Sequence, residues 1–256
     1  MRGVPDTAGG LPRTLHAIPG QPIYRRAREK TQEMKPYYEE PGITIYHGDC
    51  REILPQLDRA DLILTDPPYG INYRSNHNSS RRGKWAKWVR HENLPGIQGD
   101  DKPLDPEHLF VADKVVIFGG NYCSDKLPPS RCWIVWDKRD GIGPNNQADC
   151  EMAWTNLNKP SRIYRHLWSG LLRAGEENVS KSEKLHPHQK PLALCRFILQ
   201  YADMPKGAVV VDPYCGCGST LRAAKDMGFR AIRIDIEEKY CQKAATRMAQ
   251  EVLDLS

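Results

Sequence analysis

Short β-branched runs alternate with helix-like apolar patterns from residue 43 almost to the end of the chain. The runs predict seven strands, at residues 43–47, 61–65, 115–118, 132–136, 150–155, 208–211 and 230–234. Apolar side chains at helical spacing predict four helices, at residues 50–57, 192–201, 220–227 and 237–253. Pro191 suits the first position of a helix, and Gly228 suits the position that follows one. Strands that alternate with helices predict an open α/β sheet.

Residues 1–33 lack this alternation. They hold several Gly and Pro residues, few β-branched or aromatic side chains and no period, so we interpret them as a disordered arm. The arm contains six basic and three acidic residues and therefore supplies +3 of the net charge of +5. Residues 34–256 are predicted to form a single domain. This domain is nearly neutral, so a surface for a polyanion would depend on an uneven distribution of charge.

The composition, with 39% hydrophobic and 27% charged residues, is that of a globular protein. No apolar run approaches the roughly 18 residues that a membrane span needs, which excludes a membrane helix. The start of the chain also lacks the apolar core of a secretory signal. The eight cysteines form no Cys-x-x-Cys pair, so we expect reduced thiols in a cytoplasmic protein and no zinc ribbon.

Two unusual sequences directly follow predicted strands. Asp66-Pro67-Pro68-Tyr69-Gly70 comes after the strand at 61–65, and a glycine-containing motif at 212–220 comes after the strand at 208–211. In open α/β sheets, ligands bind outside the carboxyl ends of the strands. Both motifs are therefore candidates for ligand contact.

The motif at 212–220 has features of a nucleotide site. Gly216 and Gly218 allow a sharp turn and a close approach of backbone to a ligand. The helix that begins near Ser219 would direct its free N–H groups to the same place. Asp235 ends the next strand about 20 residues later, where an acid can bind ribose hydroxyls. A plain tight turn is the alternative, but this spacing favours a nucleotide-type ligand.

The motif at 66–69 suits an exocyclic amino group of a base. Such a group is a poor nucleophile, because its lone pair is delocalised into the ring. Two acceptors that hold its hydrogens would draw the nitrogen toward tetrahedral geometry. Asp66 and the carbonyl of Pro67 fit this task, since two prolines make the loop rigid and leave its carbonyls free. Tyr69 could stack on an extruded base. The alternative is a Pro-rich turn with a buried Tyr.

Together these sequences resemble the motifs of the amino-group DNA methyltransferases that use S-adenosylmethionine. Residues 66–69 resemble the catalytic motif of that family, and residues 212–220 resemble its cofactor motif with Tyr, Cys and Ser in place of Phe, Ser and Thr. Residues 186–191, His-Pro-His-Gln-Lys-Pro, resemble the motif that precedes the cofactor motif. The resemblance covers roughly residues 34–255.

The order of the motifs resembles that of the circularly permuted β group, because the catalytic motif precedes the cofactor motif. The resemblance implies a Rossmann-like fold with a seven-stranded, mostly parallel sheet. In chain order the strands would be the third to the seventh, followed by the first and second. The strands at 61–65 and 208–211 would then be neighbours, with Asp66 and Asp212 side by side.

The resemblance also implies the site residues. The catalytic residues are Asp66, Pro67, Pro68 and Tyr69. The cofactor-binding residues are Asp49, Asp212, Tyr214, Gly216, Gly218, Ser219, Thr220 and Asp235, with Gln189 or Lys190 at the methionine end of the cofactor. Asp49 would bind the adenine amino group of the cofactor. For His186 and His188, a role in capping a helix is the alternative. No cluster has metal-ligand spacing, and we expect no metal, because methyl transfer from a sulfonium needs none.

A basic stretch at 73–91 follows the catalytic motif and contains no acidic residue. Its candidate DNA-binding residues are Arg74, Arg81, Arg82, Lys84, Trp85, Lys87, Trp88 and Arg90. We expect the cations to contact phosphates and a tryptophan to lie at the opened base. The alternative is a solvated loop whose tryptophans pack at the sheet edge. DNA-contacting insertions are predicted near 73–105 and 156–185 of the catalytic domain.

The expected function is methyl transfer from S-adenosylmethionine to double-stranded DNA. Asp at the first catalytic position resembles the adenine-N6 enzymes, whereas the cytosine-N4 enzymes more often carry Ser; cytosine N4 is the alternative target. Protein-glutamine and RNA methyltransferases fit less well, since they usually place the cofactor motif first. A DNA-binding module without catalysis is disfavoured by intact Asp66, Tyr69, Asp212 and Gly218. Self-association as a homodimer is left open.

Overall fold

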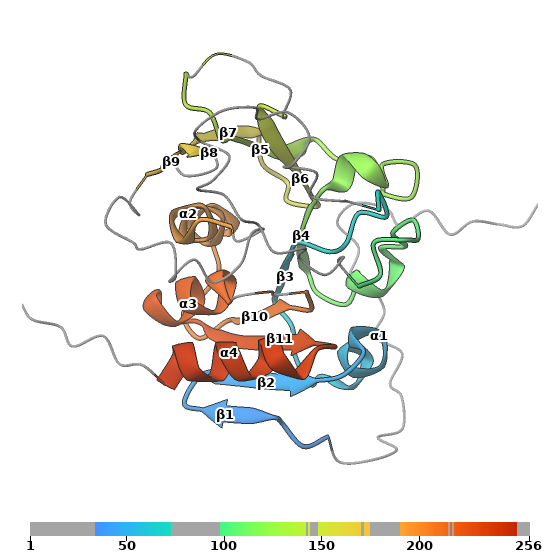
Figure 1. The fold of residues 1–256 in the computed structure, drawn as a ribbon, viewed down its shortest axis with the longest axis vertical. Helices are drawn as coiled ribbons and strands as arrows, with labels where there is room; N and C mark the ends of the chain where they lie inside the picture. Colours follow the sequence, from blue (N-terminus) through green and yellow to red (C-terminus); the bar gives the residue numbers. More distant parts are fainter. Residues whose placement is uncertain are drawn as a thin grey trace, which may run out of the picture.

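The computed structural model in Figure 1 describes residues 34–72, 98–141, 143, 148–169, 172–174, 190–214, 216 and 218–249. The predicted arm at 1–33, the basic stretch at 73–91 and residues 186–189 lie outside these residues. No helix in the described part of the chain combines the length and the apolar character that a bilayer crossing needs.

A nine-stranded sheet organises the molecule, in the order β1-β2-β11-β10-β3-β4-β6-β5-β7. Its strands are β1 (Tyr38–Glu40), β2 (Ile43–His47), β3 (Leu62–Thr65), β4 (Lys114–Phe118), β5 (Cys132–Asp137), β6 (Cys150–Thr155), β7 (Arg162–Arg165), β10 (Val209–Asp212) and β11 (Arg230–Asp235). The five strands from β2 to β4 are parallel to one another. β6 runs antiparallel to both β4 and β5. A separate hairpin pairs β8 (Trp168–Ser169) with β9 (Leu172–Arg173).

All seven predicted strands are present, each within one residue of its expected bounds. The last two strands in the chain, β10 and β11, lie between β2 and β3 in the sheet. This arrangement confirms the permuted strand order, including the parallel pairing of β10 with β3. The sheet has nine strands and not the seven expected, because β1 and β7 add one short strand at each edge.

Helices cover both faces of the sheet. α2 (Leu192–Ala202), α3 (Ser219–Asp226) and α4 (Glu238–Ala249) lie along one side in Figure 1 and share a hydrophobic core with Leu62 and Leu64 of β3. α1 (Cys50–Ile53) packs with Ile63 on the opposite face. Alternate residues of β3 therefore serve two cores, which explains why this strand reads as a continuous apolar run.

α2 and α3 agree with their predicted bounds to within one residue. α1 ends at Ile53, four residues before its predicted end, and a 3₁₀ turn follows it, since Pro55 has no N–H for an α-helical bond. α4 begins within one residue of its predicted start, and residues 250–253 of its predicted length lie outside the described residues.

Gly228 follows α3 at φ +74°, and the N–H groups of Gly228 and Phe229 donate to the carbonyls of Lys225 and Ala224. This is the Schellman pattern that the glycine predicted. Pro191 precedes the first turn of α2 as its N-cap, one position earlier than expected. Three 3₁₀ turns, η1 (Leu54–Gln56), η3 (Glu107–Leu109) and η4 (Gly120–Tyr122), complete the described helical segments.

Candidate active site

Four acidic residues lie at the carboxyl ends of four neighbouring parallel strands. Asp49 follows β2, Asp235 ends β11, Asp212 ends β10 and Asp66 follows β3. The Thr65 hydroxyl donates a buried hydrogen bond of 2.8 Å to Asp212 Oδ1 and so joins the last two strand ends. The catalytic motif and the glycine motif, 147 residues apart in the sequence at this contact, therefore meet at one edge of the sheet.

The glycine motif forms a turn at the start of α3. Gly216 has φ +53° and Gly218 has φ +84°, values at which a side chain would strain the backbone. A Cβ atom added at Gly216 would meet no heavy atom within 4 Å, so this part of the turn faces open space. Gly218 is the N-cap of α3, whose first-turn residues Ser219 and Thr220 are buried. The turn thus offers partly exposed backbone at Gly216 beside a helix N-terminus, an arrangement that suits a ligand with phosphate-like or carboxylate groups.

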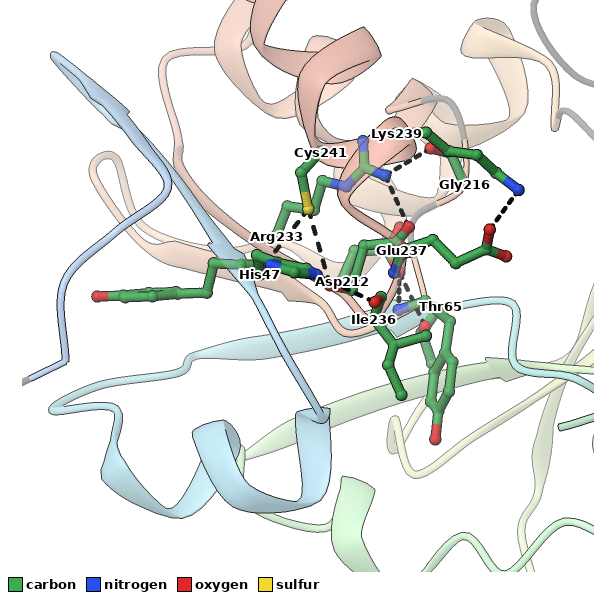
Figure 2. Close-up of polar contacts among 12 residues, drawn as sticks. His47, Thr65, Asp212, Gly216, Arg233, Ile236, Glu237, Lys239 and Cys241 are labelled. Carbon is green, nitrogen blue, oxygen red and sulfur yellow. Dashed lines mark hydrogen bonds and ion pairs between the residues drawn. The ribbon is translucent and has the colours of Figure 1, made fainter. Parts of the chain in front are cut away.

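A fully buried arginine connects this turn to Asp235. Arg233 donates from one guanidinium nitrogen to the Gly216 carbonyl and to Asp235 Oδ2, each at 2.7 Å. Figure 2 shows its side chain extending toward Gly216. The backbone N–H of Glu237 donates to the other Asp235 oxygen at 3.0 Å. Arg233 was not among the predicted site residues, although an arginine between the apolar residues of a buried strand was a usable signal.

Asp49 and Tyr214, two predicted cofactor residues, each have a partner in the protein. Asp49 caps α1 by accepting from the Arg51 N–H at 2.9 Å, and the Arg51 guanidinium forms an ion pair with its carboxylate. The guanidinium lowers the pKa of Asp49 below its usual value. The Tyr214 hydroxyl lies 2.8 Å from His108 Nε2. Burial raises the pKa of Tyr214 and lowers that of His108, so both are neutral at pH 7.

The carboxylate of Asp66 accepts hydrogen bonds on both oxygens. Tyr69 donates its hydroxyl to Oδ1 at 2.5 Å, and Lys190 donates its ammonium to Oδ2. Burial, with the nearby charge of Asp66, raises the pKa of Tyr69 well above its usual value. Tyr69 is therefore a hydrogen-bond donor throughout the physiological range.

The ring of Tyr69 depends on a close approach to the backbone after β4. A Cβ atom at Gly119 would lie 2.0 Å from Tyr69 Cε1, so only glycine leaves room for the ring. Tyr122 stacks on Tyr69 with ring centroids 4.9 Å apart and is itself 51% exposed. Neither Gly119 nor Tyr122 was predicted from the sequence. The Gly-Gly pair directly after a buried strand was the available signal.

Asp100 forms hydrogen bonds with the residues that directly follow the Asp66–Tyr69 motif. Its buried carboxylate accepts from the N–H groups of Gly70 and Ile71 at 2.8 and 3.3 Å. Its backbone carbonyl accepts from Asn72 N–H at 2.8 Å. Asp100 thereby joins the residues just before the basic stretch at 73–91 to a segment nine residues beyond the end of that stretch.

Lys190 belongs to a group of four charged residues that includes two acids. Its Nζ contacts Asp66 and lies 3.0 Å from Glu151 Oε2, while Lys138 donates to Glu151 Oε1 at 2.9 Å. Burial raises the pKa of Glu151, but the ammonium groups of Lys190 and Lys138 outweigh it and lower that pKa to about 2. Burial lowers the pKa of Lys190, but Asp66 and Glu151 raise it well above its usual value. The structure thus places Lys190 on the carboxylate of Asp66, with Glu151, which was not predicted from the sequence, beside it.

The remaining predicted site residues lie outside the described part of the chain. These are Gln189 and the DNA-binding candidates Arg74, Arg81, Arg82, Lys84, Trp85, Lys87, Trp88 and Arg90. Their roles stay predictions, as does the absence of a metal. Among the described residues, no three His, Cys, Asp or Glu side chains are grouped as metal ligands would be.

Comparison with known proteins points to one class of enzyme. A family model described as DNA methylase, of the N6/N4 type, matches residues 128–246. The chain is 25% identical to the type II methyltransferase M.ScaI of Streptomyces caespitosus over 86% of each protein. It is 29% identical to M.HpaI of Haemophilus parainfluenzae over 75% of this chain and 68% of that protein.

The fold agrees with that of a solved DNA methyltransferase. The cytosine-N4-specific PvuII DNA methyltransferase superposes with a TM-score of 0.53 and covers 87% of this chain and 91% of its own. The two sequences are 14% identical, so the likeness concerns the fold.

Proposed function

We propose that the chain is an amino-group DNA methyltransferase that methylates adenine N6 in double-stranded DNA, with S-adenosylmethionine as the methyl donor. The match of residues 128–246 to a DNA methylase family model and the similarity to two type II methyltransferases support this proposal. The observation that carries the proposal is the hydrogen bond between Thr65 and Asp212, which joins the catalytic loop to the glycine turn. A methyl donor on the turn and an amino group on Asp66 would lie at two adjacent strand ends. Asp at the first catalytic position supports adenine over cytosine. The type II relatives support a site-specific modification enzyme.

The residues at this edge fit S-adenosylmethionine. The open backbone at Gly216 and the N-terminus of α3 suit the methionine end. Asp235, held by Arg233, suits the ribose hydroxyls, and Asp49 suits the adenine amino group. Gln189 is proposed at the methionine end as well. When bound, S-adenosylmethionine supplies a methyl group that its sulfonium charge has already activated.

The catalytic loop positions and polarises the target base. Asp66 and the Pro67 carbonyl accept hydrogen bonds from the amino hydrogens, and the ring of Tyr69 stacks on the base. Bound S-adenosylmethionine would supply the methyl group to the amino nitrogen of the base and would leave as the neutral thioether. The amino nitrogen then loses a proton, which Asp66 accepts. No strong general base is assigned, because a nitrogen that has gained the methyl group is acidic. The base reaches this loop only after it leaves the DNA stack.

The basic stretch at 73–91 is proposed to contact the DNA around the extruded base. The hydrogen bonds that Asp100 accepts from the N–H groups of Gly70, Ile71 and Asn72 support this, since they hold the start of the stretch beside the Asp66–Tyr69 motif. Its six cations and lack of acids suit phosphate contacts.

One experiment tests the target base. The protein is incubated with methyl-tritiated S-adenosylmethionine and DNA from a methylation-free host, and the DNA is digested to nucleosides. We expect tritium in N6-methyladenine. Label in N4-methylcytosine would establish the alternative target, and unlabelled DNA would refute methyl transfer altogether.

A further inference from the structure

Lys190 lies between two carboxylates, and only one of them has a role in the proposed reaction. Its side chain is 12% exposed, and its Nζ contacts Asp66 Oδ2 and lies 3.0 Å from Glu151 Oε2. Lys138 holds the other oxygen of Glu151 at 2.9 Å. A shielded ammonium is stable only with a carboxylate partner. Lys190 has two such partners and can give up either one.

In this structure, Lys190 occupies the acceptor on Asp66 that a target amino group needs. Tyr69 already donates to Asp66 Oδ1, and Lys190 donates to Oδ2. The target nitrogen gains positive charge as it takes the methyl group. An ammonium that stayed on the same carboxylate would oppose this charge, and the opposition is strongest where water is excluded. Lys190 must therefore leave Asp66 when the base enters.

We propose that Lys190 and Glu151 are positioning residues that prepare Asp66 for the target base. Lys190 stands in for the amino group on Asp66 in the DNA-free enzyme and moves fully to Glu151 when the base arrives. Glu151 can receive it with little movement, because its Oε2 is already 3.0 Å from Nζ. The inference rests on the proposed function, in which Asp66 holds the target amino group.

The test compares steady-state methyl transfer to DNA from a methylation-free host for three variants: Glu151→Gln, Lys190→Met and the double variant. In Glu151→Gln, Asp66 is the only carboxylate that remains as a partner for Lys190. We therefore expect kcat/KM for DNA to fall by about tenfold or more, the usual effect of losing a hydrogen bond to a charged group. Adding Lys190→Met to Glu151→Gln restores much of the loss, because no ammonium then competes for Asp66. A merely structural role for Glu151 would make the double variant no better than the single one.

Glu40→Gln is the matched control. Glu40 and Glu151 have side chains 19% and 26% exposed, and each accepts from a lysine, at 2.8 and 2.9 Å respectively. Glu40 lies on edge strand β1 and pairs with Lys225 of α3, so its loss should leave methyl transfer unchanged. A loss equal to that of Glu151→Gln would overturn the inference.

Lys190→Met alone gives a measurement that does not depend on the folding of Glu151→Gln. Its KM for DNA falls, because the base no longer displaces an ammonium, and calorimetry shows unchanged affinity for S-adenosylmethionine. Lost cofactor affinity would overturn the inference and return Lys190 to the cofactor site. A double variant no faster than Glu151→Gln, beside an active wild type, would refute the inference alone. A wild type that transfers no methyl group to DNA would refute the proposed function with it.

Discussion

Asp66 receives two hydrogen bonds on its carboxylate, and the proposed chemistry depends on that acceptor. We expect Asp66→Ala to abolish methyl transfer and to leave cofactor binding and the fold largely intact, because Asp66 holds the target base and not the cofactor. Tritium transfer to DNA measures the first effect, and calorimetric titration with S-adenosylmethionine measures the second. Glu39→Ala, on the exposed edge of the sheet, is the control for loss of an acid. Near-normal turnover by Asp66→Ala would refute the mechanism.

Asp235 is the residue proposed to bind the ribose hydroxyls of the cofactor. We expect Asp235→Ala to weaken S-adenosylmethionine binding by about 1–3 kcal/mol, the usual cost of losing a charge-assisted hydrogen bond. The variant also removes a partner of buried Arg233, so a lower midpoint of thermal unfolding should accompany it. Calorimetry below that midpoint separates the two effects. Unchanged affinity in the folded variant would exclude Asp235 from the cofactor site.

Residues within a motif could be predicted, whereas the distant residues that form hydrogen bonds with them could not. Asp66, Tyr69 and Gly218 were recognisable because their spacing in the sequence is short and specific. Lys190 reaches Asp66 across 124 positions, and Asp100 reaches Gly70 across 30. Contacts between such distant residues depend on strand order and register, which a local pattern does not contain. The clearest local sign of such a long-range contact is a charged residue in an otherwise apolar strand, as at Arg233.

At the scale of elements, buried strands were predictable and edge strands were not. β3 and β10 are buried throughout and apolar up to their last residues, Thr65 and Asp212, because helices or turns cover both of their faces. β1 and β7 carry charged residues such as Glu39 and Arg165 on exposed positions. Charged side chains on an edge strand prevent it from pairing with another chain. They also interrupt the run of apolar residues by which a strand is recognised in a sequence.

The stretch at 73–91 is the element whose charge should decide DNA affinity. Each cation that neutralises a phosphate contributes roughly one unit to the slope of log affinity against log salt concentration. We expect Arg81→Ala with Arg82→Ala to weaken DNA binding and to flatten this slope by about two units. Affinity measured by fluorescence anisotropy at several salt concentrations gives the slope.

Arg25→Ala with Arg26→Ala removes the same charge from the N-terminal arm and serves as the control for that measurement. We expect its slope to stay close to that of the wild type. If the Arg81 and Arg82 variant matched the wild type in both slope and affinity, these arginines would not touch DNA. The recognition surface would then be sought in 156–184.

For the whole molecule, the motif order predicted the strand order because that order resembles the permuted β group, in whose sheet the strands that carry the two motifs are neighbours. A methyl donor and its acceptor must lie at adjacent strand ends, whichever loop comes first in the chain. The sheet satisfies this by placing β10 and β11, the last two strands, between β2 and β3. Permutation changes the connections between strands and preserves their neighbours, so the meeting of the two motifs at adjacent strand ends could be predicted even though the chain order is unusual.

The folded domain should begin at Met34, so residues 1–33 should not be needed for folding. Met34 packs against the second hydrophobic core, and Tyr37 N–H donates to Ile45 O at 2.8 Å. We expect a chain that begins at Met34 to keep its midpoint of thermal unfolding and most of its methyl transfer, because residues 1–33 offer few apolar side chains to bury. A chain that begins at Gly42 is the contrast: it lacks β1, leaves the edge of β2 unpaired, and should unfold at a lower temperature. Calorimetric scans of the three chains decide between these outcomes. A fall for the Met34 chain as large as that for the Gly42 chain would show that the arm is part of the folded domain.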